Sequence, residues 1–146
     1  MVSLVRASQR RQRVIAVSVE RAWEVLGRPE LLHHWFPGIV DCRVDGGTRW
    51  ITTGAGLTLE EDLLTNDPLQ HRFQYRISGG FFREHLASID AMALDGDRCM
   101  VTYASDAEPA VMAVILGGAM EGALAELARQ LESDAGPAID ALRKEP

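Results

Sequence analysis

The sequence has few of the residues that mark specialised classes of protein. Its 146 residues include two cysteines, Cys42 and Cys99, and a single lysine, Lys144, beside fourteen arginines. The cysteines form no CxxC pair and no Cys/His cluster with zinc spacing, so we expect reduced thiols, no disulfide scaffold and no metal site. Positive charge is also scarce. The net charge is −6, which argues against a nucleic-acid partner because such binding needs clustered basic residues.

Long apolar runs and leader sequences are missing as well. No apolar stretch approaches the roughly 20 residues that a membrane-spanning helix needs, and Met1–Arg6 lacks the apolar core of a signal peptide. We therefore expect no transmembrane segment and a cytoplasmic protein. The remaining composition is ordinary, 47% hydrophobic and 25% charged. It predicts a single domain over residues 1–146.

The N-terminal quarter predicts one strand and two short helices. Residues 11–17 are rich in Val and Ile, as a strand would be. Ser18 can cap a short helix that Gly27 ends. Pro29 can open a second helix, which runs to about Trp35.

The middle and the end of the chain follow two further patterns. From Ile39 to Ala107, turn signals separate β-rich runs, which predicts a six-strand antiparallel meander. From Pro109 to Glu132 the spacing is helical, and a helix of about 22 residues is roughly 33 Å long, enough to lie along a sheet. Glycines at 117, 118 and 122 indicate a close approach, a bend, or a helix that starts only after Gly118. We expect residues 133–146 to form a loose tail.

The order of these elements, with several short segments, resembles the START / birch-pollen-allergen helix-grip superfamily. Within that superfamily the chain is most similar to the polyketide cyclase/dehydrase (SRPBCC) group, over about residues 10–132. The segments that carry the resemblance are Ile15–Trp23, Trp35–Ile39, Gly47–Arg49, Glu61–Leu63, Tyr75–Ile77 and Gly122–Leu124. The resemblance implies an α+β fold in which a seven-stranded antiparallel sheet wraps around the long C-terminal helix. It also implies an elongated cavity for lipids, polyketides, hormones or other apolar molecules.

Two charged residues are candidates for chemistry inside such a cavity. Glu61 shares strand parity with Leu59 and Leu63, so it faces inward on a regular strand, where burial would raise its pKa and suit it to acid–base work. A one-residue bulge would instead turn it outward. Arg49 shares parity with Ile51 and would need a partner, for which Glu61 is the natural choice. The pair could be structural, or could orient a carbonyl or carboxylate of a ligand.

Histidine and tyrosine side chains supply further candidates. His85 is the second candidate catalytic residue, although a histidine on an apolar face is more often a satisfied core residue. Tyr75 and Tyr103 can place hydroxyl groups on the inner face. The other side chains expected to contact a ligand are Trp35, Phe36, Pro37, Ile51, Leu59, Phe73, Met112, Leu116 and Met120. Phe81 and Phe82 lie at a turn, where they could form a lid, bind a protein partner or a second copy, or pack one ring.

Three functions are consistent with these patterns. The leading hypothesis is a small-molecule binding protein with an apolar internal cavity for a lipid-, polyketide- or aromatic-like ligand, without a cofactor. The second is a polyketide aromatase/cyclase or dehydratase that uses Glu61 or His85 to move protons. The third is an interaction module with a filled core and no ligand.

Overall fold

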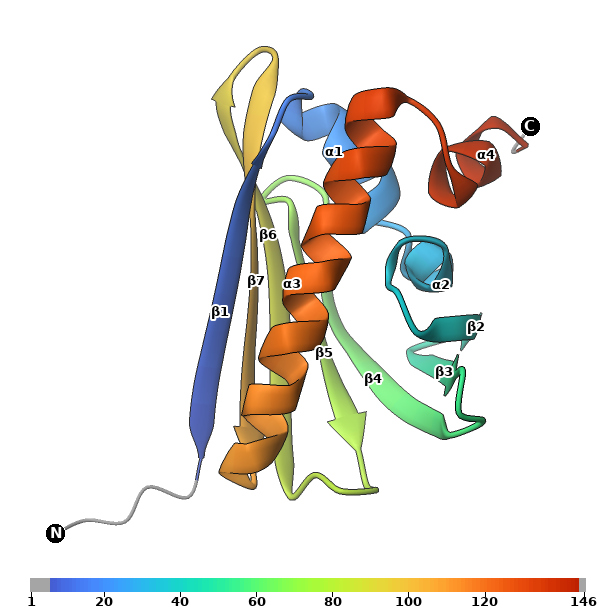
Figure 1. Ribbon diagram of the computed structural model, residues 1–146, viewed down its shortest axis with the longest axis vertical. Helices are drawn as coiled ribbons and strands as arrows, with labels where there is room; N and C mark the ends of the chain where they lie inside the picture. Colours follow the sequence, from blue (N-terminus) through green and yellow to red (C-terminus); the bar gives the residue numbers. More distant parts are fainter. Residues whose placement is uncertain (1–5, 145–146) are drawn as a thin grey trace, which may run out of the picture.

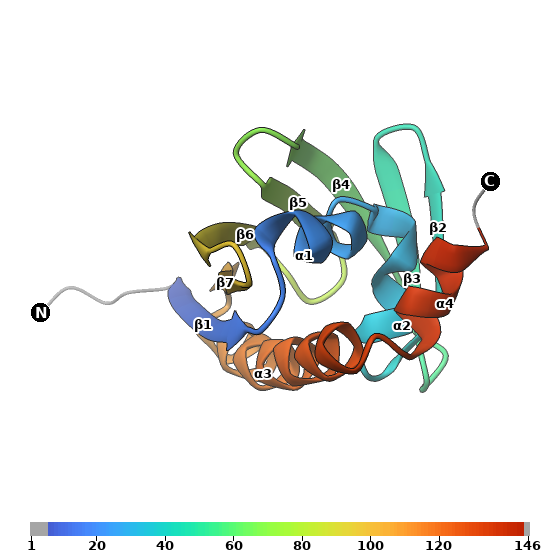
Figure 2. The same ribbon diagram turned by 90° about the horizontal axis from the view of Figure 1, so that it is seen from above.

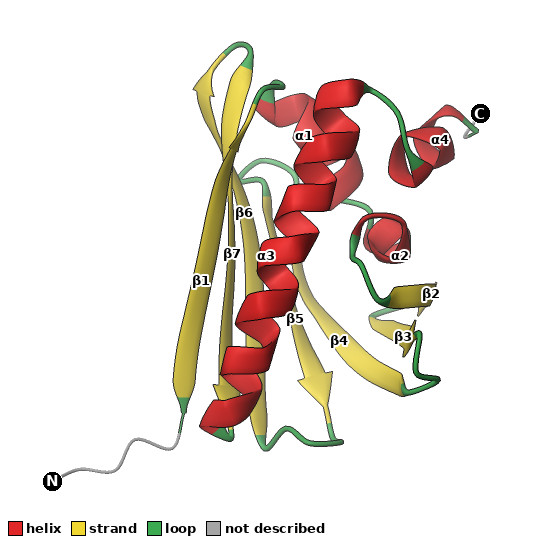
Figure 3. Ribbon diagram, in the orientation of Figure 1, coloured by secondary structure: helices red, strands yellow, loops and turns green. Residues whose placement is uncertain are grey.

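The computed structural model describes residues 6–144 as one antiparallel sheet curved around a long helix (Figure 1). Figure 3 separates its strands from its helices by colour. The strands are β1 (Ala7–Ile15), β2 (Ile39–Asp45), β3 (Thr48–Thr53), β4 (Thr58–Asp67), β5 (Arg72–Ser78), β6 (Glu84–Asp95) and β7 (Arg98–Glu108). The helical segments are α1 (Val19–Leu26), a 3₁₀ turn (Pro29–Leu31), α2 (Leu32–Trp35), α3 (Ala110–Ser133) and α4 (Pro137–Arg143). This architecture confirms the predicted helix-grip fold.

The seven strands are joined in the order β1-β7-β6-β5-β4-β3-β2. Strands β2 to β7 form the predicted meander, in which short turns connect neighbours. Strand β1 closes the arrangement by pairing with β7, from Ala7 opposite Ala107 to Ile15 opposite Cys99. Burial along β7 alternates from residue to residue, so one face of the sheet is buried beneath α3 and the other faces solvent.

Strand β1 begins earlier than the sequence predicts. Its first seven residues, Ala7–Arg13, are mostly polar because both faces carry Gln or Arg. The side chains of Gln9 and Arg11 lie beside α3, where Arg11 pairs with Glu121 at 3.2 Å. When the helix-facing positions of a strand are polar, apolar and polar residues do not alternate. The residue at which such a strand begins cannot then be predicted from hydrophobic periodicity.

The short helices α1 and α2 lie with α3 on the inner side of the curved sheet (Figure 2). Helix α1 is capped as predicted, because the Ser18 side chain accepts a hydrogen bond from the backbone of Arg21 at 3.1 Å. It buries Ala22 and Val25 completely. The 3₁₀ turn and α2 then carry the chain to β2 at the far edge of the sheet.

Helix α3 runs without interruption from Ala110 to Ser133. The alternative of a helix that begins only after Gly118 is therefore wrong. A close approach does occur at Gly117, where an added Cβ would lie 2.8 Å from the Gln9 side-chain oxygen. A Cβ at Gly118 or Gly122 would meet open space.

The expectation of a loose tail over 133–146 is wrong for its central part. Residues Pro137–Arg143 form α4, in which Ala138 and Ile139 are completely buried. Gln130 attaches this helix, since its amide oxygen accepts from the Ala138 backbone at 2.8 Å and its amide nitrogen donates to the His34 carbonyl at 2.8 Å. Two helical turns are too short to show a periodic pattern, which explains the error. Residues 145–146 lie outside the described range.

The expectation that no apolar stretch approaches the length of a membrane-spanning helix does not hold for α3. Among residues 6–144 it is long and apolar enough, by length and composition, to cross a membrane. Its first eleven residues, Ala110–Met120, carry no charged side chain. A core helix of a globular protein meets the same criteria, and α3 packs along β1 and β7 (Figure 1). Composition alone therefore does not assign it to a membrane.

Candidate functional site

A cavity of about 280 Å³ lies between α3, the segment after α2, and strands β3 to β5. Its lining is mostly apolar, with Glu61 as the one ionisable group beside the Tyr75 hydroxyl. The sequence-predicted residues that line it are Phe36, Pro37, Ile51, Leu59, Glu61, Tyr75 and Leu116. The remaining predicted residues lie outside its lining: Trp35, Arg49, Phe73, His85, Tyr103, Met112 and Met120.

Six further residues line the cavity without having been singled out from the sequence. They are Leu32, Gly38, Ile39, Thr53, Ile77 and Ala119. The parity of Ile77 with Tyr75 was an available signal, and so was the position of Ala119 one turn after Leu116. Leu32, Ile39 and Thr53 stand at the ends of short elements and Gly38 lies in a turn, so periodicity carries little information about which way they face.

Arg49 and Glu61 form a buried ion pair at the wall of the cavity. They are cross-strand partners on β3 and β4, and Arg49 Nε lies 2.5 Å from Glu61 Oε1 with both side chains 2% exposed. The expected inward position of Glu61 is thus confirmed, and a bulge at that position is excluded. The irregularity of β4 falls between Leu63 and Thr65 instead.

The remaining nitrogens of Arg49 are directed into the protein. Nη1 donates to the Pro29 carbonyl at 3.1 Å. Nη2 is buried and has no hydrogen-bond partner among the described residues. The guanidinium lies 4.8 Å from the centre of the Tyr75 ring and 5.4 Å from that of Phe73, so cation–π attraction compensates in part for the missing hydrogen bond.

Burial sets the electrostatics of this pair. It raises the pKa of the Glu61 carboxyl above its ordinary value, and the adjacent Arg49 guanidinium opposes that rise. Burial works against the charge of Arg49, but its interactions with Glu61, Tyr75 and Tyr103 together outweigh burial, so the pKa of Arg49 is raised. Arginine remains protonated at neutral pH. Glu61 therefore combines a fixed orientation with a pKa closer to the range useful for proton transfer.

Two tyrosine hydroxyls meet beside the ion pair. The Tyr75 and Tyr103 hydroxyl groups hydrogen-bond to each other in the core, and burial raises the pKa of both phenols, so both are protonated at neutral pH. Two hydroxyls carry two protons, and the bond between them uses one. Neither oxygen has another hydrogen-bond partner among residues 6–144. Whichever phenol donates, one O–H of the pair is not used between them, and Tyr75 is the member of the pair that lines the cavity.

His85 is fully engaged within the protein. Strands β5 and β6 are paired only from Arg72 to Tyr75, and beyond that point His85 Nδ1 accepts from the Ile77 backbone at 2.9 Å. Its Nε2 lies 3.2 Å from the Ser105 hydroxyl. Burial lowers the pKa of His85 to about 4. These contacts favour the alternative of a satisfied core histidine, and a catalytic role for His85 stays a prediction.

The two phenylalanines after Gly80 have different environments. Phe82 is 9% exposed and its ring packs edge-on against His85. Phe81 is 67% exposed. The ring of Phe82 is thus packed, in agreement with the alternative in which one of the two rings packs against the protein. A role of Phe81 as a lid or in binding a partner stays a prediction.

The sequence matches a known protein family. The model of the family "polyketide cyclase / dehydrase and lipid transport" matches residues 6–133. The chain belongs to this family. No curated protein matches the sequence.

Solved structures of low identity support the fold of this polyketide cyclase/dehydrase family member. XoxI from Bacillus cereus is 19% identical with a TM-score of 0.80, covering 86% of this chain and 95% of that one. Norcoclaurine synthase from Thalictrum flavum, bound to a transition-state analogue, is 15% identical with a TM-score of 0.71, covering 91% and 98%. The di-domain aromatase/cyclase BexL from the BE-7585A biosynthetic pathway is 12% identical with a TM-score of 0.75, covering 88% and 47%.

Proposed function

We propose that this protein binds a small, mostly apolar molecule with a carbonyl or phenolic oxygen in the cavity beneath α3. The observation that carries the proposal is the Tyr75 phenol, hydrogen-bonded to Tyr103 and beside Glu61 in a mostly apolar lining. Apolar burial would supply the affinity, and the hydroxyl, with the Arg49–Glu61 pair behind it, would orient the oxygen. Family membership agrees with a role in binding or cyclising such a molecule.

The volume of the cavity limits the ligand. About 280 Å³ lies just below the range of roughly 300–1,000 Å³ that is typical of sites for drug-sized ligands. A molecule of one or two rings, or a short acyl chain, fits this size better than a diacyl lipid. A cytoplasmic location remains part of the proposal. The third hypothesis expects a filled core, and the cavity of about 280 Å³ argues against it.

A pair of probes tests the proposal. We expect the bicyclic ketone 1-tetralone to raise the melting temperature of the protein more than tetralin, the hydrocarbon without the oxygen, because ligand binding stabilises the folded state. The substitution Ala119→Phe places a ring in the cavity and should abolish the shift. Val114→Phe, at an exposed position of the same helix, is the matched control and should retain it. Equal shifts in wild type and Ala119→Phe would contradict the proposal.

A second candidate function is a cyclase or dehydratase, which the buried carboxyl of Glu61 in the cavity wall favours. The Glu61 carboxylate would take a proton from a carbon between two carbonyls, and Tyr75 would donate a hydrogen bond to the resulting enolate oxygen. The enolate carbon would attack a second carbonyl of the same chain, forming a C–C bond. The alkoxide so formed would recover the proton from Glu61 before water is lost.

Turnover of a short 3,5,7-triketo thioester, in which the C2 enolate can attack the C7 carbonyl to close a six-membered ring, distinguishes this candidate from simple binding. Glu61→Gln keeps the size and polarity of the side chain but cannot transfer the proton, so ring formation should fall to the uncatalysed rate. Binding of 1-tetralone should persist in that variant. A turnover unchanged by Glu61→Gln would remove the residue from the mechanism, and no turnover in wild type would leave binding as the function.

A further inference from the structure

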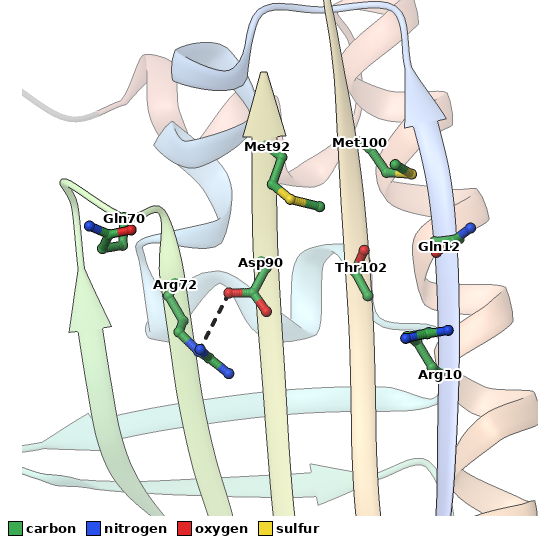
Figure 4. Close-up of a pocket in the computed structure, with 8 residues that line it drawn as sticks. All are labelled: Arg10, Gln12, Gln70, Arg72, Asp90, Met92, Met100 and Thr102. Carbon is green, nitrogen blue, oxygen red and sulfur yellow. Dashed lines mark ion pairs between the residues drawn. The ribbon is translucent and has the colours of Figure 1, made fainter. Parts of the chain in front are cut away.

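The outer face of the sheet, which is turned away from α3, carries a second hollow (Figure 4). Its volume is about 630 Å³, larger than that of the cavity beneath the helix. None of its lining residues belongs to that cavity. The proposed function therefore leaves this hollow unexplained.

The strand register shows how the hollow forms. One row of cross-strand partners runs from Gln12 on β1 through Thr102 and Asp90 to Arg72 on β5. The two central strands supply the shorter side chains of this row, and the outer two supply the longer ones. Long side chains on β1 and β5 therefore stand as walls on either side of a floor formed by β6 and β7.

The floor continues as an apolar surface. Met92 and Met100 are cross-strand partners in the row beside Asp90 and Thr102, and Met92 is 48% exposed. Methionine side chains are flexible and polarisable, so they adapt to the flat face of an apolar group. Exposed methionines on a sheet face offer a contact that a wholly polar surface would not.

The walls carry positive charge. Arg72 Nε lies 3.5 Å from Asp90 Oδ1, a loose ion pair. Arg10, on the opposite wall, forms no ion pair with any residue between 6 and 144. In Figure 4 the Arg72 side chain extends toward Asp90 on β6, and the Arg10 side chain lies beside its own strand β1 at the other side of the hollow. The hollow thus has one excess positive charge in a chain whose net charge is −6.

We propose that this hollow binds a small organic anion with a flat apolar body, such as an aromatic carboxylate. The carboxylate lies between Arg10 and Arg72, which donate charge-assisted hydrogen bonds to it. The apolar body rests on Met92 and Met100. The methionine floor selects against inorganic phosphate, and the guanidinium groups select against the uncharged analogue of the same shape.

The methionines themselves provide the test. With methyl-¹³C-methionine in the whole chain, Met92 and Met100 report on the outer hollow, and Met112 and Met120 report on α3. The probe is 2-naphthoate. We expect saturable shifts of the first two methyl signals, unmoved signals of the second two, and much weaker effects from uncharged 2-naphthalenemethanol. Raising the ionic strength should weaken binding, because the arginines are exposed.

Substitutions assign the charge contacts. Arg10→Gln and Arg72→Gln should each raise the Kd of 2-naphthoate roughly five- to tenfold. Arg76→Gln is the matched control, since Arg76 is an exposed arginine on β5 outside the hollow that pairs with Asp62. It should leave the Kd unchanged.

Three outcomes would overturn the proposal. One is the absence of shifts at Met92 and Met100 up to millimolar naphthoate, and another is an equal response to the uncharged alcohol. The third is movement of Met112 and Met120 alone. These residues flank Leu116 and Ala119, the α3 residues that line the inner cavity, so this result would favour the proposed function instead of an outer site. Failure of the outer site and failure of the inner cavity are therefore seen separately.

Discussion

At the scale of single residues, the Arg49–Glu61 pair carries a large desolvation cost. Two charges leave water for a site that is 2% exposed, and their mutual attraction compensates only if the geometry is good. The 2.5 Å contact and the bond to the Pro29 carbonyl supply that geometry. An apolar pair of similar volume could pack there without charge, so the pair's retention is consistent with a role in orienting a ligand.

Breaking one half of this pair should cost more than removing both. Arg49→Met leaves the Glu61 carboxyl buried without its partner, and we expect a loss of about 3 kcal/mol in the free energy of unfolding. The double variant Arg49→Met/Glu61→Leu should recover much of that loss. Urea unfolding of the four proteins measures the coupling. A loss in the double variant equal to the sum of the two single losses would show that the pair does not interact energetically.

His85 should make stability depend on pH in the acid range. Burial lowers its folded pKa to about 4, against about 6.5 in the unfolded chain. Between these values the unfolded state binds the extra proton, so stability falls as the pH drops from about 6.5 to about 4. The total effect is on the order of 3 kcal/mol. Above pH 6.5 both states are neutral at His85 and the contribution is constant.

The variant His85→Gln isolates this contribution from other titrating groups. Glu61 acts in the opposite direction, since its raised pKa favours the folded state as the pH falls. Denaturant midpoints of wild type and variant at pH 7 and pH 5 give the difference. A wild-type stability that changes no more than that of His85→Gln would contradict the assignment.

At the scale of elements, α3 carries glycines for different reasons. Gly117 faces β1, where a Cβ would lie 2.8 Å from the Gln9 side chain and 3.0 Å from that of Arg11. Gly118 and Gly122 have open space around them. Only at Gly117 would an added Cβ therefore have to displace neighbouring side chains, whereas Gly118 and Gly122 lower the helix propensity with no packing contact that needs them.

Alanine substitutions separate these cases. Gly118→Ala should raise the free energy of unfolding by up to about 1 kcal/mol, because alanine favours the helix and meets nothing. Gly117→Ala should gain less or lose stability, since Gln9 and Arg11 have to move. Thermal unfolding of the two variants gives the comparison. Equal gains would show that the side chains on β1 yield freely.

At the scale of the whole molecule, net charge and exposed apolar groups act against each other. The charge of −6 at pH 7 keeps copies apart, while Phe81 and Val114 are more than 60% exposed. Near the isoelectric point of 5.2 the repulsion disappears. A second copy or a protein partner at Phe81 stays a prediction.

Self-association should therefore grow as the pH falls from 8 towards 5.2. We expect light scattering to increase with concentration more steeply at the lower pH, and Phe81→Ser to reduce that increase. Leu69→Ser removes an apolar group that is 90% exposed elsewhere on the surface, so it serves as the control. Scattering that does not respond to pH, or an equal effect of both substitutions, would contradict a specific role for Phe81.

Local pattern was sufficient for most of the architecture. Alternation along the meander, the Ser18 cap and the helical spacing after Pro109 depend only on neighbouring residues, and they led to the observed order of elements. Strand parity also placed Arg49, Glu61 and Tyr75 on the buried face. These inferences held because side-chain direction in a regular strand or helix follows from backbone geometry alone.

Contacts between distant segments settled the rest. Ile139 is buried only because Gln130 and its neighbours receive α4, and β1 begins at Ala7 because β7 and α3 supply partners for its polar side chains. His85 is a core residue because the pairing of β5 and β6 ends at Tyr75, and its ring nitrogen, instead of a backbone carbonyl, accepts the hydrogen bond from the Ile77 N–H. Burial and hydrogen-bond satisfaction are properties of the packed chain, so no local pattern could have assigned them.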